Sequence, residues 1–191
     1  MIEIIALLCF AYLLGSISSA ILLSKIMGFK DPRSEGSNNP GATNVLRIAG
    51  KKAAFLTLLG DCLKGFIPVL VAAALFTAPL IVALTAFTAF AGHCFPIFFS
   101  FRGGKGVATA IAASVAFNWI VGAILIANWL LFARVFKISS LAAIISFCAL
   151  PLLVYWRVPD LRVAGVFAAM SIILIWRHRS NIARLLSGSE G

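Results

Sequence analysis

Long apolar runs, separated by short polar segments, occupy most of this chain. The first run extends from Ile4 to Ser24 without a charged residue. Further runs cover residues 53–76, 80–99, 141–156 and 163–176. Because a helix needs about 20 apolar residues to cross the hydrocarbon layer of a membrane, the pattern predicts an all-α, polytopic membrane protein.

One more apolar stretch, 106–133, is too long for one compact span and short for two. Asn118 and Trp119 interrupt it near its middle, which favours two short helices at about 106–118 and 119–136. Spans of about 14 residues rise only about 21 Å, so we expect these two to be incomplete or sunk in the membrane. The prediction is seven transmembrane helices in a single domain, residues 1–191.

The composition agrees with a membrane protein, and the charges give it an orientation. The chain is 62% apolar and 12% charged, whereas soluble domains are about 45–50% apolar and about 25% charged. Its 16 Lys and Arg residues outnumber its six Asp and Glu residues, a net charge of +10. Cytoplasmic loops are enriched in Lys and Arg. Seven helices place 14 of the basic residues on one side and two on the other, against 11 and five if 106–133 is one span. We therefore expect the N-terminus outside, the C-terminus in the cytoplasm, and every long polar segment on the cytoplasmic face.

The longest polar segment, 30–52, contains two prolines and several Gly, Ser and Asn residues. Irregular backbone of this kind does not face lipid. The pattern turns helical after Gly41, with Thr43 or Asn44 as the expected cap and Gly50 as the expected stop. A helix N-terminus that follows Gly and Ser is suited to bind an anion, and Arg47 can add a bidentate contact to a phosphate. The alternative is a solvated turn on an interfacial helix.

A second polar segment, 102–109, surrounds Lys105 with three glycines, Gly103, Gly104 and Gly106. Glycines let the backbone approach an anion closely. The segment is not a nucleotide-binding P-loop, because that pattern needs Gly where Phe99 stands and Ser or Thr directly after the lysine. A smaller phosphate fits the segment, and a tight turn with a topology-setting lysine is the alternative.

Ionisable residues also occur inside or beside the apolar runs. Asp61 and Lys64 are three residues apart, so they share a helix face. They either face a protein or water cavity within the membrane or lie at its boundary if the span begins later. We expect His93, between Gly92 and Pro96, to be packed or interfacial and not catalytic.

The tail that follows the last apolar run carries His178, Asn181 and several arginines. If the last helix continues, His178 and Asn181 share a face, with Arg184 one turn beyond. Histidine is the usual general base near neutral pH, and asparagine can orient a hydroxyl. For the arginines, the favoured interpretation is a stop-transfer cluster that binds anionic lipid head groups.

Motifs for several kinds of chemistry are missing from the sequence. It lacks a nucleophile elbow, a zinc pattern and a pair of catalytic carboxylates, and we predict no metal ion, no cofactor and no nucleic-acid partner. Phosphate-friendly loops beside an acyl-chain environment suit acyl transfer from an activated donor, where positioning and charge neutralisation can suffice. The rival interpretations are a small organic-phosphate transporter that uses Asp61 and Lys64, and a non-enzymatic scaffold that recruits anionic lipid.

Six motifs in this order resemble those of the bacterial acyl-phosphate-dependent glycerol-3-phosphate acyltransferases, a seven-helix inner-membrane family. The motifs lie at residues 15–19, 36–47, 61–65, 92–93, 103–109 and 177–182. One departure is Glu35, where the family pattern has a small residue. The resemblance covers nearly the whole chain and implies a multi-pass enzyme of the bacterial inner membrane whose active site faces the cytoplasm.

The resemblance also implies a reaction and its partners. A long-chain acyl phosphate gives its acyl group to the sn-1 hydroxyl of glycerol 3-phosphate, which yields 1-acyl-glycerol 3-phosphate (lysophosphatidic acid) and phosphate, the first step of phospholipid synthesis. The donor is neither acyl-CoA nor acyl carrier protein. This agrees with the absence of a His-x-x-x-x-Asp motif, since Phe98 and Ala183 stand five residues after the two histidines. Membrane lipid and the enzyme that makes acyl phosphate are the other expected partners.

The family's functional residues carry over onto matching positions of this chain. Those implied to hold substrate phosphate are Ser37, Arg47, Lys105 and Ser140. Those implied to shape the two substrate-binding loops are Asn39, Thr43 and Asn44 in the first, and Gly103, Gly104 and Gly106 in the second. His178 and Asn181 are implied to engage the attacking hydroxyl, although a substrate phosphate is an alternative acceptor of its proton.

Overall fold

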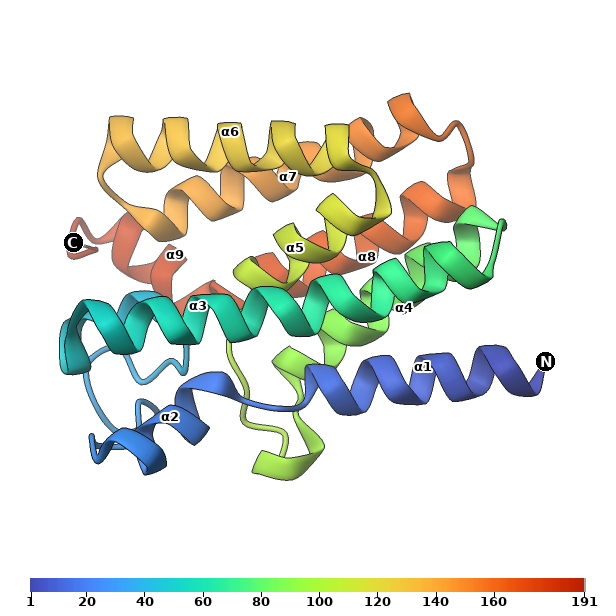
Figure 1. Cartoon of the computed structure of the whole chain (residues 1–191). Helices are drawn as coiled ribbons and strands as arrows, with labels where there is room; N and C mark the ends of the chain where they lie inside the picture. Colours follow the sequence, from blue (N-terminus) through green and yellow to red (C-terminus); the bar gives the residue numbers. More distant parts are fainter. Residues whose placement is uncertain (191) are drawn as a thin grey trace.

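The computed structural model describes residues 1–190, and all of its regular elements in that range are helices. They are α1 (Ile2–Gly15), α2 (Ser19–Met27), α3 (Ala42–Leu75), α4 (Pro79–Cys94), the 3-10 turn η1 (Ile97–Phe99), α5 (Val107–Phe117), α6 (Trp119–Phe136), α7 (Ser139–Arg157), α8 (Leu161–Arg177) and α9 (Arg179–Leu186). The long helices lie side by side in one bundle, with the two chain ends at opposite ends of it (Figure 1).

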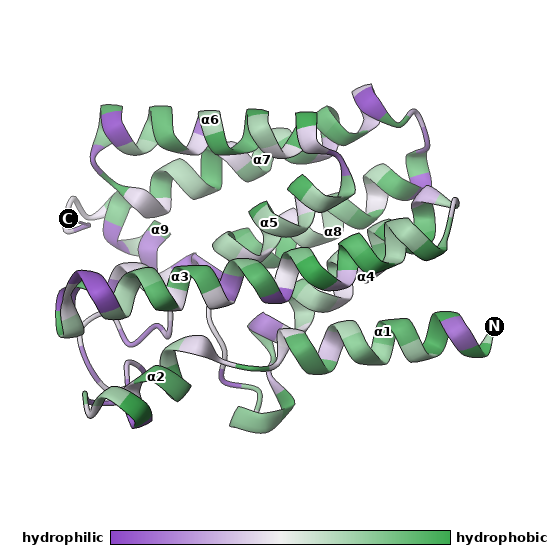
Figure 2. Ribbon diagram, viewed as in Figure 1, coloured by the Kyte–Doolittle hydropathy of each residue, from purple (hydrophilic) through white to green (hydrophobic). Residues whose placement is uncertain are grey.

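The helices are those of a polytopic membrane protein. Within the described residues, four helices are long and apolar enough to cross a membrane, and six spans result if the bent pairs α1–α2 and α8–α9 each count as one. Helix α5 is a further, shorter apolar helix. Apolar side chains cover the outside of the bundle, where Leu70, Leu130 and Ile172 are exposed. Hydrophilic residues are concentrated at the end formed by α2, the start of α3 and α9, which we call the polar end (Figure 2).

The predicted interruption of the middle apolar stretch is confirmed. Asn118 separates α5 from α6, and its side-chain oxygen accepts hydrogen bonds from the backbone N–H groups of Ile120 (3.1 Å) and Val121 (3.2 Å). This is a typical N-cap. The predicted bounds are confirmed, because α5 has 11 residues and α6, Trp119–Phe136, has 18. The expectation of an incomplete span holds only for α5, since α6 is long enough to cross a membrane. The apolar pattern of α6 continues through Arg134 and ends only at Lys137, which adopts a left-handed conformation.

The first apolar run is not the single helix that the sequence predicted. It bends by 42° between α1 and α2, because the chain leaves the helical conformation at Ser18. The break frees the carbonyl group of Ile17, and the ammonium group of Lys64 donates a hydrogen bond to it at 2.8 Å. A broken helix is tolerated inside a membrane protein where neighbouring helices satisfy the freed backbone groups.

Helix α3 begins within the segment that we interpreted as a loop. Its start at Ala42 and the break at Gly50 agree with the predicted helix, since Gly50 has a left-handed φ of 79° that glycine adopts at little cost. The expected cap residues were wrong, because Gly41 is the N-cap and forms no side-chain hydrogen bond there. Beyond Gly50 the chain continues as a helix, which makes α3 34 residues long.

Small residues let the helices that carry the polar residues approach closely. A side chain at Gly15 would collide with the Ala89 backbone of α4, and one at Gly65 would collide with the Thr109 backbone of α5. Close backbone approach of this kind is common between membrane helices. It fixes α1 against α4 and α3 against α5, and so brings the buried polar side chains of α3, α4 and α5 within contact distance.

Candidate active site

The first polar loop is organised by the buried side chain of Asn44. Its oxygen accepts a hydrogen bond from the backbone N–H of Ser37 at 2.9 Å, and its nitrogen donates to the carbonyl groups of Pro32 and Glu35, both at 2.9 Å. All of these contacts are within the loop. Asn44 therefore shapes the loop, as the resemblance implied, and does so without facing an open site.

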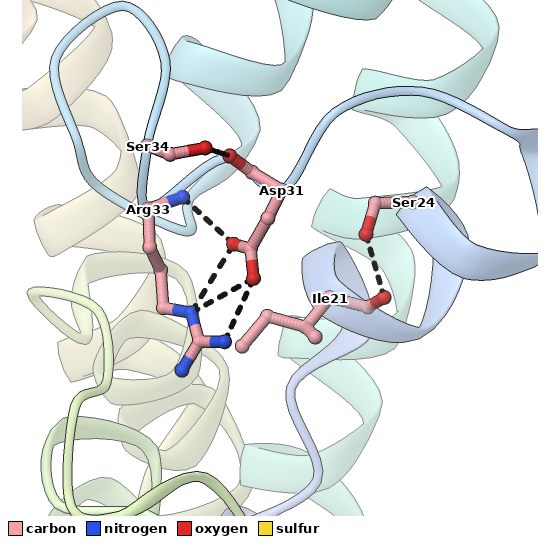
Figure 3. Close-up of polar contacts among 5 residues, drawn as sticks. All are labelled: Ile21, Ser24, Asp31, Arg33 and Ser34. Carbon is pink, nitrogen blue, oxygen red and sulfur yellow. Dashed lines mark hydrogen bonds and ion pairs between the residues drawn. The ribbon is translucent and has the colours of Figure 1, made fainter.

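A local ion pair, between residues 31 and 33, stabilises the start of the same loop. The guanidinium of Arg33 contacts the carboxylate of Asp31 at 2.7 Å, and the backbone N–H of Arg33 donates to the same carboxylate at 2.9 Å (Figure 3). These hydrogen bonds hold the pKa of Asp31 below its usual range. The Arg33 guanidinium also lies 6.0 Å from the centre of the Phe99 ring, so it connects the first loop to η1. Glu35, the residue that departs from the family pattern, pairs with the exposed Lys30 at 2.6 Å.

The glycine loop, residues 102–106, packs directly on α4. A side chain at Gly103 would collide with the carbonyl of His93, and one at Gly104 would collide with the imidazole ring of His93. The backbone N–H of Gly104 donates to the His93 carbonyl at 3.2 Å. These glycines are therefore needed for close packing of the loop. His93 is buried and packed, as predicted.

Arg177 holds the other side of the glycine loop. Its Nε donates to the carbonyl of Gly104 at 3.1 Å, and its Nη2 donates to the carbonyl of Gly103 at 2.5 Å. The guanidinium also lies 5.7 Å from the centre of the Phe95 ring. The interpretation of Arg177 as part of a lipid-binding cluster was therefore wrong, because its charge is used inside the protein.

Lys105 lies where several cations converge. The half-buried ammonium group interacts electrostatically with the guanidinium groups of Arg47, Arg177 and Arg184 and with the carboxylate of Glu190. Burial, reinforced by the three guanidinium groups, lowers the pKa of Lys105 to about 8, although Glu190 opposes the shift. Residues from α3, the glycine loop, α8 and α9 thus form one strongly positive region, which we call the cation cluster.

A carboxylate is bound beside the cation cluster, and sequence reasoning missed it. Glu190 accepts hydrogen bonds from Ser140 Oγ at 2.6 Å, from Asn181 Nδ2, and from Arg184 Nε at 2.6 Å. The only available sequence signal was its rarity, as one of six acidic residues in a chain of net charge +10. The contact shows that Ser140, Asn181 and Arg184 can hold an oxyanion together.

His178 and Asn181 are both buried, but not on one continuous helix. The chain bends by 57° between α8 and α9, and His178 is the residue at the bend. Because His178 Nδ1 bonds the Leu174 carbonyl at 2.8 Å, this nitrogen is the donor and Nε2 of the neutral ring is an acceptor. Asn181 Oδ1 is buried without a partner among the described residues. Two hydrogen-bond acceptors are therefore available within one turn of each other.

Asp61 and Lys64 form a buried ion pair at 2.9 Å. The hydroxyl of Thr109 donates to the Asp61 carbonyl at 2.9 Å and, having no second proton, accepts from His93 Nδ1 at 3.2 Å. Both residues face the protein interior, since only 2% of Asp61 and 4% of Lys64 is exposed, and the position of the pair relative to the membrane boundary stays a prediction. The two charges neutralise each other inside the protein, whereas the transporter hypothesis used them as a substrate site.

A cavity of about 640 Å³ separates the first loop from the glycine loop. It is lined by Asp31, Arg33, Ser34, Asn38, Pro40, Phe101, Arg102, Gly103 and Arg177. Ser37 and Thr43 are exposed and Asn39 is half-buried in the same region. The binding roles of these three side chains stay predictions. The same residues contain no group of three or more His, Cys, Asp or Glu side chains that could hold a metal ion.

These features define a helical, polytopic membrane protein with a cluster of cations at its polar end. Residues 5–188 match the family model described as glycerol-3-phosphate acyltransferase. The glycerol-3-phosphate acyltransferase of Methylococcus capsulatus is 48% identical over 184 residues, which cover 96% of this chain and 93% of that protein. The corresponding protein of Hydrogenovibrio crunogenus is 51% identical over 181 residues, 94% of this chain and 87% of that one.

Solved structures agree with the sequence relatives. The crystal structure of PlsY (YgiH), an integral membrane glycerol 3-phosphate acyltransferase, in its glycerol 3-phosphate form superimposes with a TM-score of 0.94 at 38% identity. Its lysophosphatidic acid form gives 0.89 at 37% identity. Both alignments cover 99% of this chain and 94% of the other. The chain belongs to the glycerol-3-phosphate acyltransferase family and is an integral membrane acyltransferase.

Proposed function

We propose that this chain transfers a long-chain acyl group from acyl phosphate to the sn-1 hydroxyl of glycerol 3-phosphate at the cytoplasmic face of the bacterial inner membrane. The products are 1-acyl-glycerol 3-phosphate (lysophosphatidic acid) and phosphate. The observation that carries the proposal is the cation cluster around Lys105, because two phosphate-bearing substrates repel each other unless several cations neutralise them. PlsY, the structural relative, has been solved in glycerol 3-phosphate and lysophosphatidic acid forms.

In this proposal, Lys105 and Arg47 bind substrate phosphate, and Ser140 lies at the edge of the same site. Arg47 is more exposed than Lys105, so we assign Lys105 the larger share of the neutralisation. A guanidinium presents a planar fork to a phosphate, whereas an ammonium acts as a point charge. Ser37, Asn39, Thr43 and the glycine loop line the approach from the cavity.

The reaction needs no covalent intermediate on the protein. The sn-1 hydroxyl oxygen attacks the carbonyl carbon of acyl phosphate, an ester bond forms, and the bond between that carbon and the phosphate oxygen breaks. The cation cluster stabilises the charge that develops on the leaving phosphate. The Nε2 atom of His178 accepts the hydroxyl proton, and the unpartnered oxygen of Asn181 orients the hydroxyl. The direct experiment is acyl transfer by the purified protein from acyl phosphate to glycerol 3-phosphate.

The proposed orientation is testable by reporter fusion. A green fluorescent protein fused after the C-terminus is expected to fluoresce in bacteria, because this domain matures in the cytoplasm. A periplasmic alkaline phosphatase fused at Val158, between α7 and α8, is expected to be active, since that connection lies at the other end of α8. An inactive phosphatase at Val158 together with an active one at the C-terminus would reverse the orientation.

The pH dependence of kcat/KM is expected to report on Lys105. The pKa of this group is lowered to about 8 in the free protein, and only its cation binds phosphate, so kcat/KM should fall as the pH rises through about 8. The pH profile of kcat/KM reflects groups of the free enzyme. The variant Lys105→Arg, less active but permanently charged, should lose this alkaline limb. If kcat/KM of Lys105→Arg still falls near pH 8, a group other than Lys105 causes the fall.

A further inference from the structure

We propose that Arg177 is a positioning residue that fixes the Lys105 loop against the helix end that carries His178. The inference rests on the proposed function, because it assigns Lys105 and His178 to the same reaction. The sequence interpretation gave Arg177 a role outside the protein, in lipid binding. Its two backbone contacts instead join segments that are more than 70 residues apart in the chain.

The geometry of the contact is that of a fork. Nε and Nη2 of one guanidinium each bind a different carbonyl, those of Gly104 and Gly103, and the Gly104 carbonyl belongs to the peptide group that joins directly to Lys105. Arg177 is also the last residue of α8, and His178 is the next residue in the chain. One side chain therefore sets the backbone on both sides of the reaction that we propose.

The loop needs such a contact because its own sequence does not fix its conformation. Three of the four residues 103–106 are glycines, which have more backbone freedom than any other residue. On the α4 side, the backbone N–H of Gly104 donates one hydrogen bond, to the His93 carbonyl. The guanidinium of Arg177 supplies two further bonds from the opposite side. The guanidinium also stacks on the Phe95 ring, 5.7 Å from the ring centre, and this contact holds both of its hydrogen-bonding nitrogens in place.

The variants that test this role are Arg177→Lys and Arg177→Gln. Lysine keeps the charge but loses the planar fork, and glutamine loses both. Misplacement of a reacting group by about 1 Å can cost about 10²-fold in rate, and we expect each variant to lower kcat/KM by about 10- to 100-fold. The matched controls are Arg179→Lys and Arg179→Gln, since Arg179 is an exposed neighbour that stacks on Trp176. Both controls should keep near-normal activity.

A double-mutant cycle with Lys105→Ala separates positioning from a general structural role. If Arg177 acts through Lys105, then Arg177→Gln should change the residual activity of Lys105→Ala by less than about 2-fold, because residues that work through one another are not additive. A side chain that merely stabilises the bundle would lower activity by the same factor in both backgrounds. The cycle is measured with purified proteins, and folding is checked by size-exclusion chromatography and thermal unfolding in detergent.

Three results would overturn the inference without touching the proposed function, provided that the unaltered chain is active. They are full additivity in the cycle, normal kcat/KM in Arg177→Lys, and failure of both Arg177 variants to fold, which would make Arg177 a requirement of the bundle and not of the loop. An unaltered, folded chain that forms no product from acyl phosphate would instead refute the proposed function. The two failures are therefore distinguishable.

Discussion

Replacing Lys105 by alanine is expected to lower kcat/KM for glycerol 3-phosphate by on the order of 10²-fold or more. The variant removes a charge-assisted contact worth about 1.5–3 kcal/mol, and each 1.36 kcal/mol corresponds to about a factor of ten in rate. It also leaves two substrate phosphates facing each other with less neutralisation. The loss is measured by initial rates of acyl transfer with purified protein.

Arg47 is a second member of the cation cluster whose substitution tests the site. We expect Arg47→Ala to lose most activity, though less than Lys105→Ala, because Arg47 is more exposed. We expect Arg47→Lys to fail as well, since a point charge cannot form the planar fork. The matched control is Lys51→Ala, an exposed cation one turn further along α3. Full activity in both alanine variants at Lys105 and Arg47 would refute the site.

Removing the acceptor atom of His178 is the second change with a large expected effect. The variant His178→Asn retains an N–H that can donate to the Leu174 carbonyl, but it has no counterpart of Nε2. Because a general base contributes about 10²- to 10⁴-fold, we expect kcat to fall by at least about 10²-fold while KM for glycerol 3-phosphate changes little. The loss should be visible in single-turnover as well as steady-state rates.

The control for His178 lies two residues away. Ser180→Ala removes an exposed hydroxyl from the same segment and should leave kcat unchanged. A drop of less than about 10-fold in His178→Asn would be below the usual contribution of a general base. That result would indicate that a substrate phosphate, and not His178, accepts the proton of the attacking hydroxyl, which is the alternative that the resemblance left open.

Helix boundaries set by strong local signals were predictable from the sequence. Asn118 separates α5 from α6 because its side chain caps the second helix, and Gly50 interrupts α3 because its φ is positive. Both effects depend on one residue and its immediate neighbours. The bend after Gly15 was not predictable in this way, because the Ile17 carbonyl is satisfied by Lys64, 47 residues further along the chain.

A residue of the candidate site was predictable from the sequence only where its type and its neighbours in the chain favour a single function. Lys105 among three glycines pointed to an anion, and the structure places it in a cluster of cations. Arg177 was misread because a terminal arginine serves equally as a topology signal, a lipid contact or an internal donor, and only the fold distinguishes these uses. Glu190 was missed because its partners, Ser140 and Asn181, come from α7 and α9, and no spacing in the sequence connects them.

The most direct test of the central claim is acyl transfer by the purified protein, offered radiolabelled glycerol 3-phosphate with either palmitoyl phosphate or palmitoyl-CoA. Lys105→Ala serves as the matched inactive variant. We predict lysophosphatidic acid acylated at the sn-1 position and one phosphate released per product from palmitoyl phosphate, with no product from palmitoyl-CoA. A folded, monodisperse protein that forms no product from palmitoyl phosphate would contradict the account.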